Sequence, residues 1–173
     1  MEPSAELVHA RAARSASLTG HANTTARIAP GLALAVADNV TMTIPALAPG
    51  DDRSTELRVA SAEALLVAKL VKIADRMSDA ARGQSRRVVD KDSLDVLRLL
   101  QHIDPDHAAA RLSELDPSSD ASSEAARAVD VLREHATTVD GALPSCAQSA
   151  AYGDPTVPQS MVILTEELLA CFE

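Results

Sequence analysis

Two kinds of hydrophobic spacing divide the chain into an N-terminal third and a longer C-terminal part. Between Arg27 and Leu47, apolar residues recur at every second position on both sides of Asp38-Asn39, a dipeptide with turn chemistry. This alternation around a turn is typical of an antiparallel hairpin. After a break at Pro49 to Asp52, residues Glu56 to Ala60 have the pattern of one more short strand. The sequence therefore predicts strands within residues 25–60.

After Ser61 the spacing becomes helical. Apolar residues at i, i+4, i+7 and i+11 share one face of a helix that is predicted to begin after the N-cap Ser61 and to run to about Ala80. Asp90 is the predicted N-cap of a second helix that runs to about Ile103. Prolines and a polar connector divide the remainder into three more predicted helices, near Asp106–Leu115, Ser122–Thr138 and Val157–Phe172.

These patterns predict an α+β fold that is mostly helical. A small antiparallel sheet in the N-terminal third is expected to pack on a helical region that spans residues 61–173, within a single domain of residues 1–173. Residues 1–24 include a segment rich in Ala and Arg without a recurring apolar face, and we expect this part of the chain to be frayed.

Composition narrows the classes of function. The 173 residues are 46% hydrophobic and include 33 alanines but no Trp, one Tyr and one Phe. Recognition of nucleic acid by aromatic base stacking is therefore excluded. Charge interrupts every strongly apolar run well before it reaches membrane-spanning length, so no membrane partner is expected. With two cysteines and no disulfide framework, we expect a cytoplasmic protein with reduced thiols.

Charge is unevenly distributed along this acidic chain. The formal net charge is −9, yet the segment from Lys69 to Lys91 holds seven basic and three acidic residues, a local charge of +4 that leaves −13 on the rest. Lys69, Lys72 and Arg76 line one edge of the first predicted helix, and Arg86 follows in the loop after it. A local patch of this kind can hold a phosphate although the global field repels nucleic acid. It is also the ordinary pattern of a solvated helix face followed by a basic loop.

A second candidate lies at the start of the next helix, in Asp90-Lys91-Asp92-Ser93-Leu94-Asp95. Carboxylates in the first turns of a helix are stabilised by capping and by the helix dipole, which explains them without a ligand. Asp92, however, projects near the apolar side of the helix, toward the body of the protein and near Lys69. A carboxylate in that position needs a buried partner or a ligand.

The two helices together resemble a known family. Residues Val59–Arg76, followed after a spacer by Lys91–Leu100, resemble the C-terminal half of nucleotidyltransferase-like proteins. The most similar group is the AbiE-type nucleotidyltransferase toxins of bacterial toxin–antitoxin systems. In that family the helix after the sheet carries a Lys, and the next helix opens with Lys/Arg-Asp-x-x-Asp. The similar stretch covers Ile44 to Leu100, about a third of the chain.

Roles for several residues follow from this resemblance. It implies that Lys69 binds nucleotide phosphate, that Asp92 is an active-site acid and that Asp95 is structural. Three further residues of the same basic segment join Lys69 as candidate nucleotide-binding residues: Lys72, Arg76 and Arg86.

Other parts of the family's active site are missing from the sequence. The family grips the nucleotide phosphate with a Gly-Ser turn and holds Mg²⁺ with acids on adjacent strands. None of the six glycines is followed by Ser, and the Asp-x-Asp pairs belong to helix starts or turns. Three interpretations stay open: a truncated relative, a protein whose N-terminal part belongs to another polypeptide, and a family member that has lost catalysis and kept a binding surface.

The sequence therefore predicts a nucleotidyltransferase-like protein that is truncated or catalytically incomplete, with a site for nucleotide or RNA phosphate near Lys69 and Asp92. Whether it is an enzyme stays open. Complete activity would be Mg²⁺-dependent transfer of a nucleoside monophosphate from a nucleoside triphosphate to an RNA or protein acceptor. The alternative is a non-catalytic interaction module that forms a homodimer, or pairs with another protein, through an exposed sheet edge.

Three lesser candidates have ordinary explanations. Two histidines and two aspartates at positions 102–107 could form a metal cluster, but Asp104-Pro105 is typical of a helix start, and no metal site is predicted. Cys146 has no His nearby in the sequence and is predicted to be a small buried thiol rather than a nucleophile. Gly50 to Arg53 is predicted to be a turn rather than an acidic site.

Overall fold

The computed structural model describes residues 15–17, 25–27, 29–83 and 90–172. The chain divides into two compact units, residues 1–30 and residues 31–173, where the sequence analysis expected a single domain. In the first unit, strand β1 (Ser15–Ser17) pairs antiparallel with strand β2 (Thr25–Arg27). The rest of the segment expected to be frayed, residues 1–14 and 18–24, lies outside the described residues.

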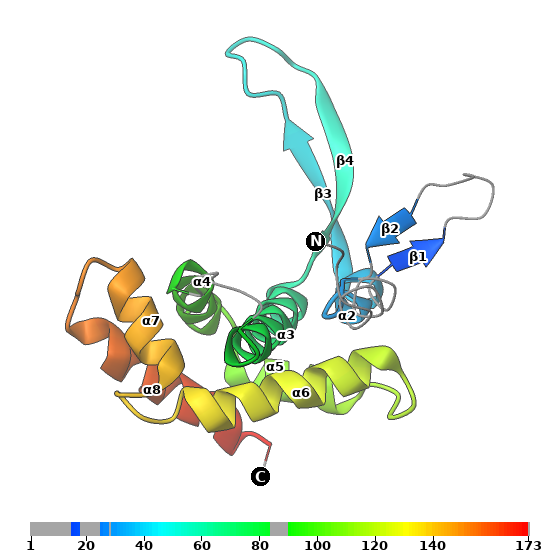
Figure 1. The fold of residues 1–173 in the computed structure, drawn as a ribbon. Coiled ribbons are helices and arrows are strands. Elements are labelled where there is room, and N and C mark those ends of the chain that lie inside the picture. Colours follow the sequence, from blue (N-terminus) through cyan, green and yellow to red (C-terminus); the bar gives the residue numbers. More distant parts are fainter. Residues whose placement is uncertain (1–14, 18–24, 28, 84–89, 173) are drawn as a thin grey trace, which may run out of the picture. The chain divides into compact units, whose positions relative to one another are not determined.

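The second unit is α+β and mostly helical, as predicted (Figure 1). The helices expected from the hydrophobic spacing correspond to α3 (Ala62–Ala81), α4 (Asp90–Leu100), α5 (Pro105–Ser113), α6 (Asp120–His135) and α8 (Thr156–Ala170). Ser61 is the N-cap of α3, because its hydroxyl oxygen accepts a hydrogen bond from the Ala64 amide at 3.0 Å. The predicted start of the first long helix is therefore confirmed.

The hairpin of this unit lies in a different place from the one predicted. Strand β3 (Asn39–Pro45) pairs antiparallel with strand β4 (Ser54–Ala60), and the turn between them contains Gly50. The region on the N-terminal side of Asp38-Asn39, predicted to be a strand, is instead the short helix α2 (Ala33–Ala37). The prediction of a hairpin turn at Asp38-Asn39 is wrong, whereas the turn predicted at Gly50 to Arg53 is confirmed.

Helix α2 forms because both of its ends are satisfied by side chains. The carboxylate of Glu124 on α6 accepts hydrogen bonds from the amides of Gly31 at 2.5 Å and Ala33 at 3.0 Å. At the other end, the Asn39 side-chain amide donates to the carbonyl of Val36 at 2.8 Å. Alanine has the highest helix propensity, and it alternates with the apolar residues here. The alternation of apolar residues here therefore predicted a strand wrongly, because the alanines between them favour a helix.

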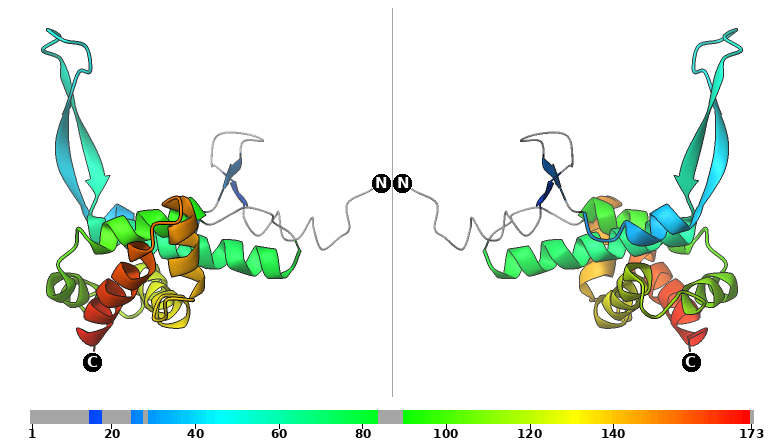
Figure 2. Two further views of the ribbon diagram at one scale, coloured as in Figure 1. Left: turned by 90° about the vertical axis from the view of Figure 1, so that its left-hand side faces the viewer. Right: turned by 90° about the vertical axis from the view of Figure 1, so that its right-hand side faces the viewer.

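The β3–β4 hairpin does not pack on the helices along its length, in contrast to the expectation. Its strand residues are exposed except at the base, where Asn39, Val59 and Ala60 are half-buried. Figures 1 and 2 show the hairpin extending away from the helices of the same unit. The hairpin thus contributes little to the core of this chain.

The core of the second unit surrounds α3. Buried side chains on α3 include Leu66, Leu70 and Ile73, and this helix packs against α2, α4 and α6. Many of the facing positions are small, with alanines buried on α5, α6 and α7. Close packing of small side chains lets helices approach without aromatic residues. Helices α3 and α4 also pack side by side, with their polar edges in contact.

Helix α7 (Ala142–Ala150) was not predicted, because Pro144 suggested a break. Pro144 lies in the first turn of α7, where its missing N–H has no helical partner to lose. The helix begins after Gly141, where an added Cβ would lie 2.6 Å from the carbonyl oxygen of His135. Helix α7 packs along α4 and brings Leu143 and Ala147 into the core.

Candidate functional site

The basic residues of α3 form a ridge along one side of the helix. Lys69, Lys72 and Arg76 are spaced by three and four residues, which places their side chains one above the other on the helix surface. Their side chains are 29%, 45% and 21% exposed, so each is partly covered by neighbouring residues. The ridge is therefore not the freely solvated face that the ordinary reading of the sequence would give.

The acidic residues that face this ridge come from the first two turns of α4. The described part of helix α4 begins at Asp90, which was predicted to be its N-cap and is instead a helical residue. Asp92 is buried, with 8% of its side chain exposed, and Asp95 follows one turn later at 23%. Asp92 therefore lies on the inner side of this helix, toward Lys69, as its position on the helical wheel predicts.

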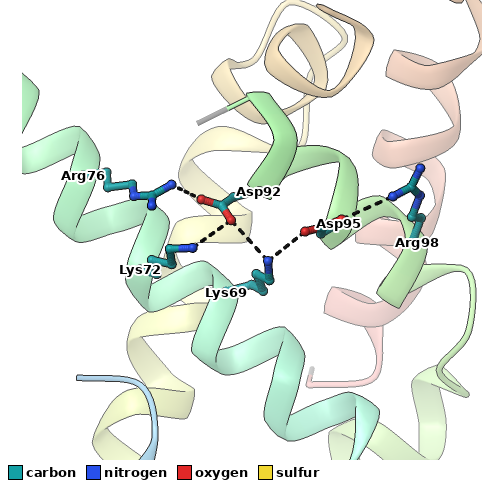
Figure 3. A network of polar contacts seen from close by, with 6 residues as sticks. All are labelled: Lys69, Lys72, Arg76, Asp92, Asp95 and Arg98. Carbon is teal, nitrogen blue, oxygen red and sulfur yellow. Dashed lines mark hydrogen bonds and ion pairs between the residues drawn. The ribbon is translucent and has the colours of Figure 1, made fainter. Parts of the chain in front are cut away.

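Figure 3 shows how the two helices are joined by ion pairs. The ammonium of Lys69 donates to Asp92 Oδ1 at 3.2 Å and to Asp95 Oδ2 at 2.7 Å. The ammonium of Lys72 donates to Asp92 Oδ1 at 3.0 Å, and Arg76 Nη1 donates to Asp92 Oδ2. All these donors lie on α3 and both acceptors lie on α4, so the contacts hold the two helices together. We call these five residues, together with Arg98, the α3–α4 cluster.

Arg98 completes the cluster on the outer side of α4. Its Nη1 donates to Asp95 Oδ1 at 3.3 Å, and its side chain is 65% exposed. With this contact, all four oxygens of the two carboxylates accept hydrogen bonds. Sequence reasoning missed Arg98, although its position three residues after Asp95 on a helix is the signal that could have found it.

The hydrogen bonds of the cluster shift the pKa values of its members in the direction that keeps them charged. Burial acts to raise the pKa of Asp92, but hydrogen bonds from Lys72 and Lys69 outweigh it and leave that pKa below its ordinary value. The hydrogen bond from Lys69 likewise lowers the pKa of Asp95. Burial acts to lower the pKa of Lys69, but its hydrogen bonds to Asp95 and Asp92 raise that pKa overall. The carboxylates are therefore ionised and Lys69 is protonated near neutral pH.

The cluster carries more positive than negative charge. Four basic side chains meet two carboxylates, which leaves a formal surplus of two positive charges within the bonded set. The nearby carboxylate of Asp75 does not join it, because Asp75 Oδ1 accepts from Arg127 on α6 at 2.7 Å. Lys72 and Arg98 are the most exposed members and present the surplus to solvent. Arg86, the remaining candidate from the sequence, lies outside the described residues.

The residues of the cluster do not fit Mg²⁺. Both oxygens of Asp92 already accept from cationic donors, and three cations surround that carboxylate. A divalent cation placed there would meet electrostatic repulsion from Lys69, Lys72 and Arg76. The described residues also contain no group of three or more His, Cys, Asp or Glu side chains arranged to hold a metal ion.

The lesser candidates have structural roles or weak reactivity. Asp104 caps α5, accepting from the His107 amide at 2.8 Å, which explains the Asp-Pro pair that could have suggested a metal cluster. Burial and the neighbouring Asp90 carboxylate raise the pKa of Cys146 to about 11, so this half-buried thiol is a poor nucleophile. Within the described part of the chain, no helix combines the length and the apolar character that crossing a bilayer requires.

Comparisons of the chain with protein-family models, with curated proteins and with solved structures find no match.

Proposed function

We propose that this chain is a nucleotidyltransferase-like protein that binds a nucleotide or RNA through phosphate at the α3–α4 cluster and lacks the means to catalyse transfer by itself. The observation that carries the proposal is the positive surplus of the cluster, in which four basic side chains meet two carboxylates. An incoming phosphate would be bound by charge-assisted hydrogen bonds from groups that are already oriented.

In this proposal Asp92 positions the cations and takes no proton. A carboxylate whose pKa lies below its ordinary value is a weak general base near neutral pH. Both of its oxygens also already accept hydrogen bonds from cationic partners. Asp92 instead holds Lys69, Lys72 and Arg76 in convergent positions, as a counter-ion does. Of these three residues, Lys72 is the best candidate for direct contact with phosphate, because it is the most exposed and its ammonium group is held by Asp92.

The experiment is a calorimetric titration of the full chain with ATP, GTP, CTP and UTP, each with and without Mg²⁺, and with a short RNA. We expect binding that is lost when adenosine replaces ATP, because the contacts are made to phosphate. Lys72→Ala should weaken it by about tenfold to a hundredfold, the range for a charge-assisted hydrogen bond.

Lys91 provides the matched control. It is exposed, lies one residue before Asp92 and donates none of the hydrogen bonds described for the cluster. Lys91→Ala should therefore change affinity far less than Lys72→Ala. The chain has three lysines, Lys69, Lys72 and Lys91, so protection from a lysine-acylating reagent gives a second readout. Bound nucleotide should protect Lys72 and Lys69 but not Lys91. Equal effects of the two Lys→Ala variants, or no binding at millimolar nucleotide, would contradict the proposal.

The alternative, an interaction module, is supported by a different part of the molecule. The exposed β3–β4 hairpin carries apolar side chains that are between 37% and 57% exposed. The partner that fits this hairpin is argued below.

A further inference from the structure

The β3–β4 hairpin has one apolar and one polar face. The register places Val40 opposite Val59 and Met42 opposite Leu57, and Ile44 continues the same face toward the turn. Val40, Met42 and Leu57 are 57%, 45% and 52% exposed. An isolated two-stranded hairpin is marginally stable in water, and its apolar face needs a covering surface or further strands. Additional strands or a covering surface would therefore stabilise this hairpin.

Hydrogen bonds at both ends of the hairpin establish which backbone groups point outward. The Ala46 amide donates to the Arg53 carbonyl at 2.8 Å, and the Ser61 amide donates to the Asp38 carbonyl at 3.1 Å. Backbone groups alternate in direction along an antiparallel strand. The N–H and C=O groups of four residues of β4 therefore point away from β3: Ser54, Glu56, Arg58 and Ala60. Among the described residues, no strand pairs with this edge.

The outer edge of β4 is better suited to pairing than the outer edge of β3. On β3 the outward positions end with Pro45, which has no N–H to donate. Every outward residue of β4 has both a donor and an acceptor. An edge that offers both at each outward position is a template for another strand.

The charges on β4 are complementary to a second copy of the same strand. If two β4 strands pair antiparallel about Leu57, Glu56 of each copy lies opposite Arg58 of the other. The neighbouring registers would instead place Glu56 opposite Glu56, or Arg58 opposite Arg58. Opposite charges on facing residues stabilise a strand pair, and like charges destabilise it. The β4 strand is thus self-complementary in the Leu57-centred register.

From this geometry we propose that two copies of the chain associate through their β4 strands into a four-stranded antiparallel sheet with a two-fold axis at Leu57. The apolar residues of both hairpins then form one continuous face, because directly opposite residues in an antiparallel pair project to the same side. A two-fold interface needs a patch that is complementary to itself, and the Glu56/Arg58 arrangement provides one. This inference is independent of phosphate binding at the α3–α4 cluster.

Charge exchange at two exposed positions tests the register. Sedimentation analysis of the full chain should show a concentration-dependent dimer. Glu56→Arg or Arg58→Glu alone places like charges opposite each other at both symmetry-related positions and should weaken the dimer at least about tenfold. The double variant with both changes restores opposite pairs and should restore the dimer. An equimolar mixture of the two single variants should also form a heterodimer.

Glu134→Arg is the matched control, because it makes the same charge change as Glu56→Arg at a position on α6 whose side chain is 76% exposed, away from the hairpin. It should leave dimerisation unchanged. A chain that remains monomeric at millimolar concentration would overturn the proposal. So would a dimer that resists both single charge changes, or a double variant that fails to recover.

Disulfide cross-linking tests the axis directly. In a background with Cys146→Ala and Cys171→Ala, Leu57→Cys places a thiol beside its own symmetry mate, in a facing pair whose Cα separation of about 4.5–5.5 Å allows a disulfide. It should cross-link rapidly under mild oxidation. Met42→Cys lies on the other strand of the same face and should cross-link slowly. Faster cross-linking by Met42→Cys would show that the copies meet through β3, and would reject the β4 interface.

Discussion

The α3–α4 cluster buries charged side chains, whereas the β3–β4 hairpin exposes apolar ones. In the cluster, charged groups are partly buried between two helices, and all four oxygens of Asp92 and Asp95 accept hydrogen bonds. In the hairpin, apolar groups are exposed, with Val40 and Leu57 at 57% and 52%. Buried charge is tolerated only with partners, and an exposed apolar face is typical of a contact surface. The cluster is therefore complete within one chain, whereas we infer that the hairpin is completed by a second copy.

The largest expected effect on stability comes from removing the carboxylate of Asp92, which three basic side chains share. Asp92→Ala leaves Lys69, Lys72 and Arg76 partly buried without their shared acceptor, and we expect the free energy of unfolding to fall by about 2–4 kcal/mol. Urea denaturation followed by circular dichroism measures this change. Asp130→Ala is the control, because Asp130 is 73% exposed and makes only a 3.5 Å pair with Arg133. Its effect should stay within about 0.5 kcal/mol. Comparable small effects of both variants would mean that the cluster contributes nothing to stability.

Acid should remove much of this stabilisation. The folded state holds the pKa values of Asp92 and Asp95 below their ordinary value of 3.8, so their contribution is fully present above that pH and is lost as the pH falls through the lowered values. The difference in unfolding free energy between the wild type and Asp92→Asn should therefore be constant from about pH 5 to 7 and narrow below about pH 4. Urea titrations at a series of pH values measure it. If the difference in unfolding free energy between the wild type and Asp92→Asn grew as the pH fell, the prediction would be contradicted.

A smaller effect is expected where the hairpin joins the helices. Glu124 accepts from the amides of Gly31 and Ala33 at the start of α2, the helix that leads into β3. Glu124→Ala should cost about 1–2 kcal/mol, as the loss of a helix cap does, and should speed hydrogen exchange at those two amides. Glu134→Ala is the control, because its side chain is 76% exposed on the same helix. Unchanged exchange at Gly31 and Ala33 would show that α2 does not need this cap.

These contacts show which parts of the structure local patterns could predict. The helical spacing from Ser61 onward predicted α3, its N-cap and most later helices, because each depends on the sequence within one element. The mistakes lie where distant residues decide. Glu124 caps α2 from 91 residues away, and the alternating apolar residues there gave no sign of it. Helix α7 was missed because Pro144 reads as a break unless the helix start is known to lie two residues earlier.

The candidate site follows the same division. The helical wheel placed Asp92 on the inner side of its helix near Lys69, and their ammonium and carboxylate groups lie 3.2 Å apart. Spacing within α3 also placed Lys72 and Arg76 on the same edge. That these three cations converge on one carboxylate depends on how α3 and α4 pack together in the shared core, to which Leu70 of α3 and Leu97 of α4 both belong. Neither helix alone contains that information.

The smallest expected effect concerns the exposed face of the hairpin and depends on protein concentration. Leu57 is half-exposed within one chain, so Leu57→Thr removes little buried surface and keeps a residue that favours strands. In dilute solution the free energy of unfolding should change by less than about 0.5 kcal/mol. Leu66→Ala, in the core on α3, should cost about 2–4 kcal/mol at every concentration. Because a dimer stabilises the folded state by mass action, the penalty for Leu57→Thr should grow as the protein is concentrated, whereas that for Leu66→Ala should not. A penalty at Leu57 that is independent of concentration would place its packing within one chain and remove the contrast between the hairpin and the cluster.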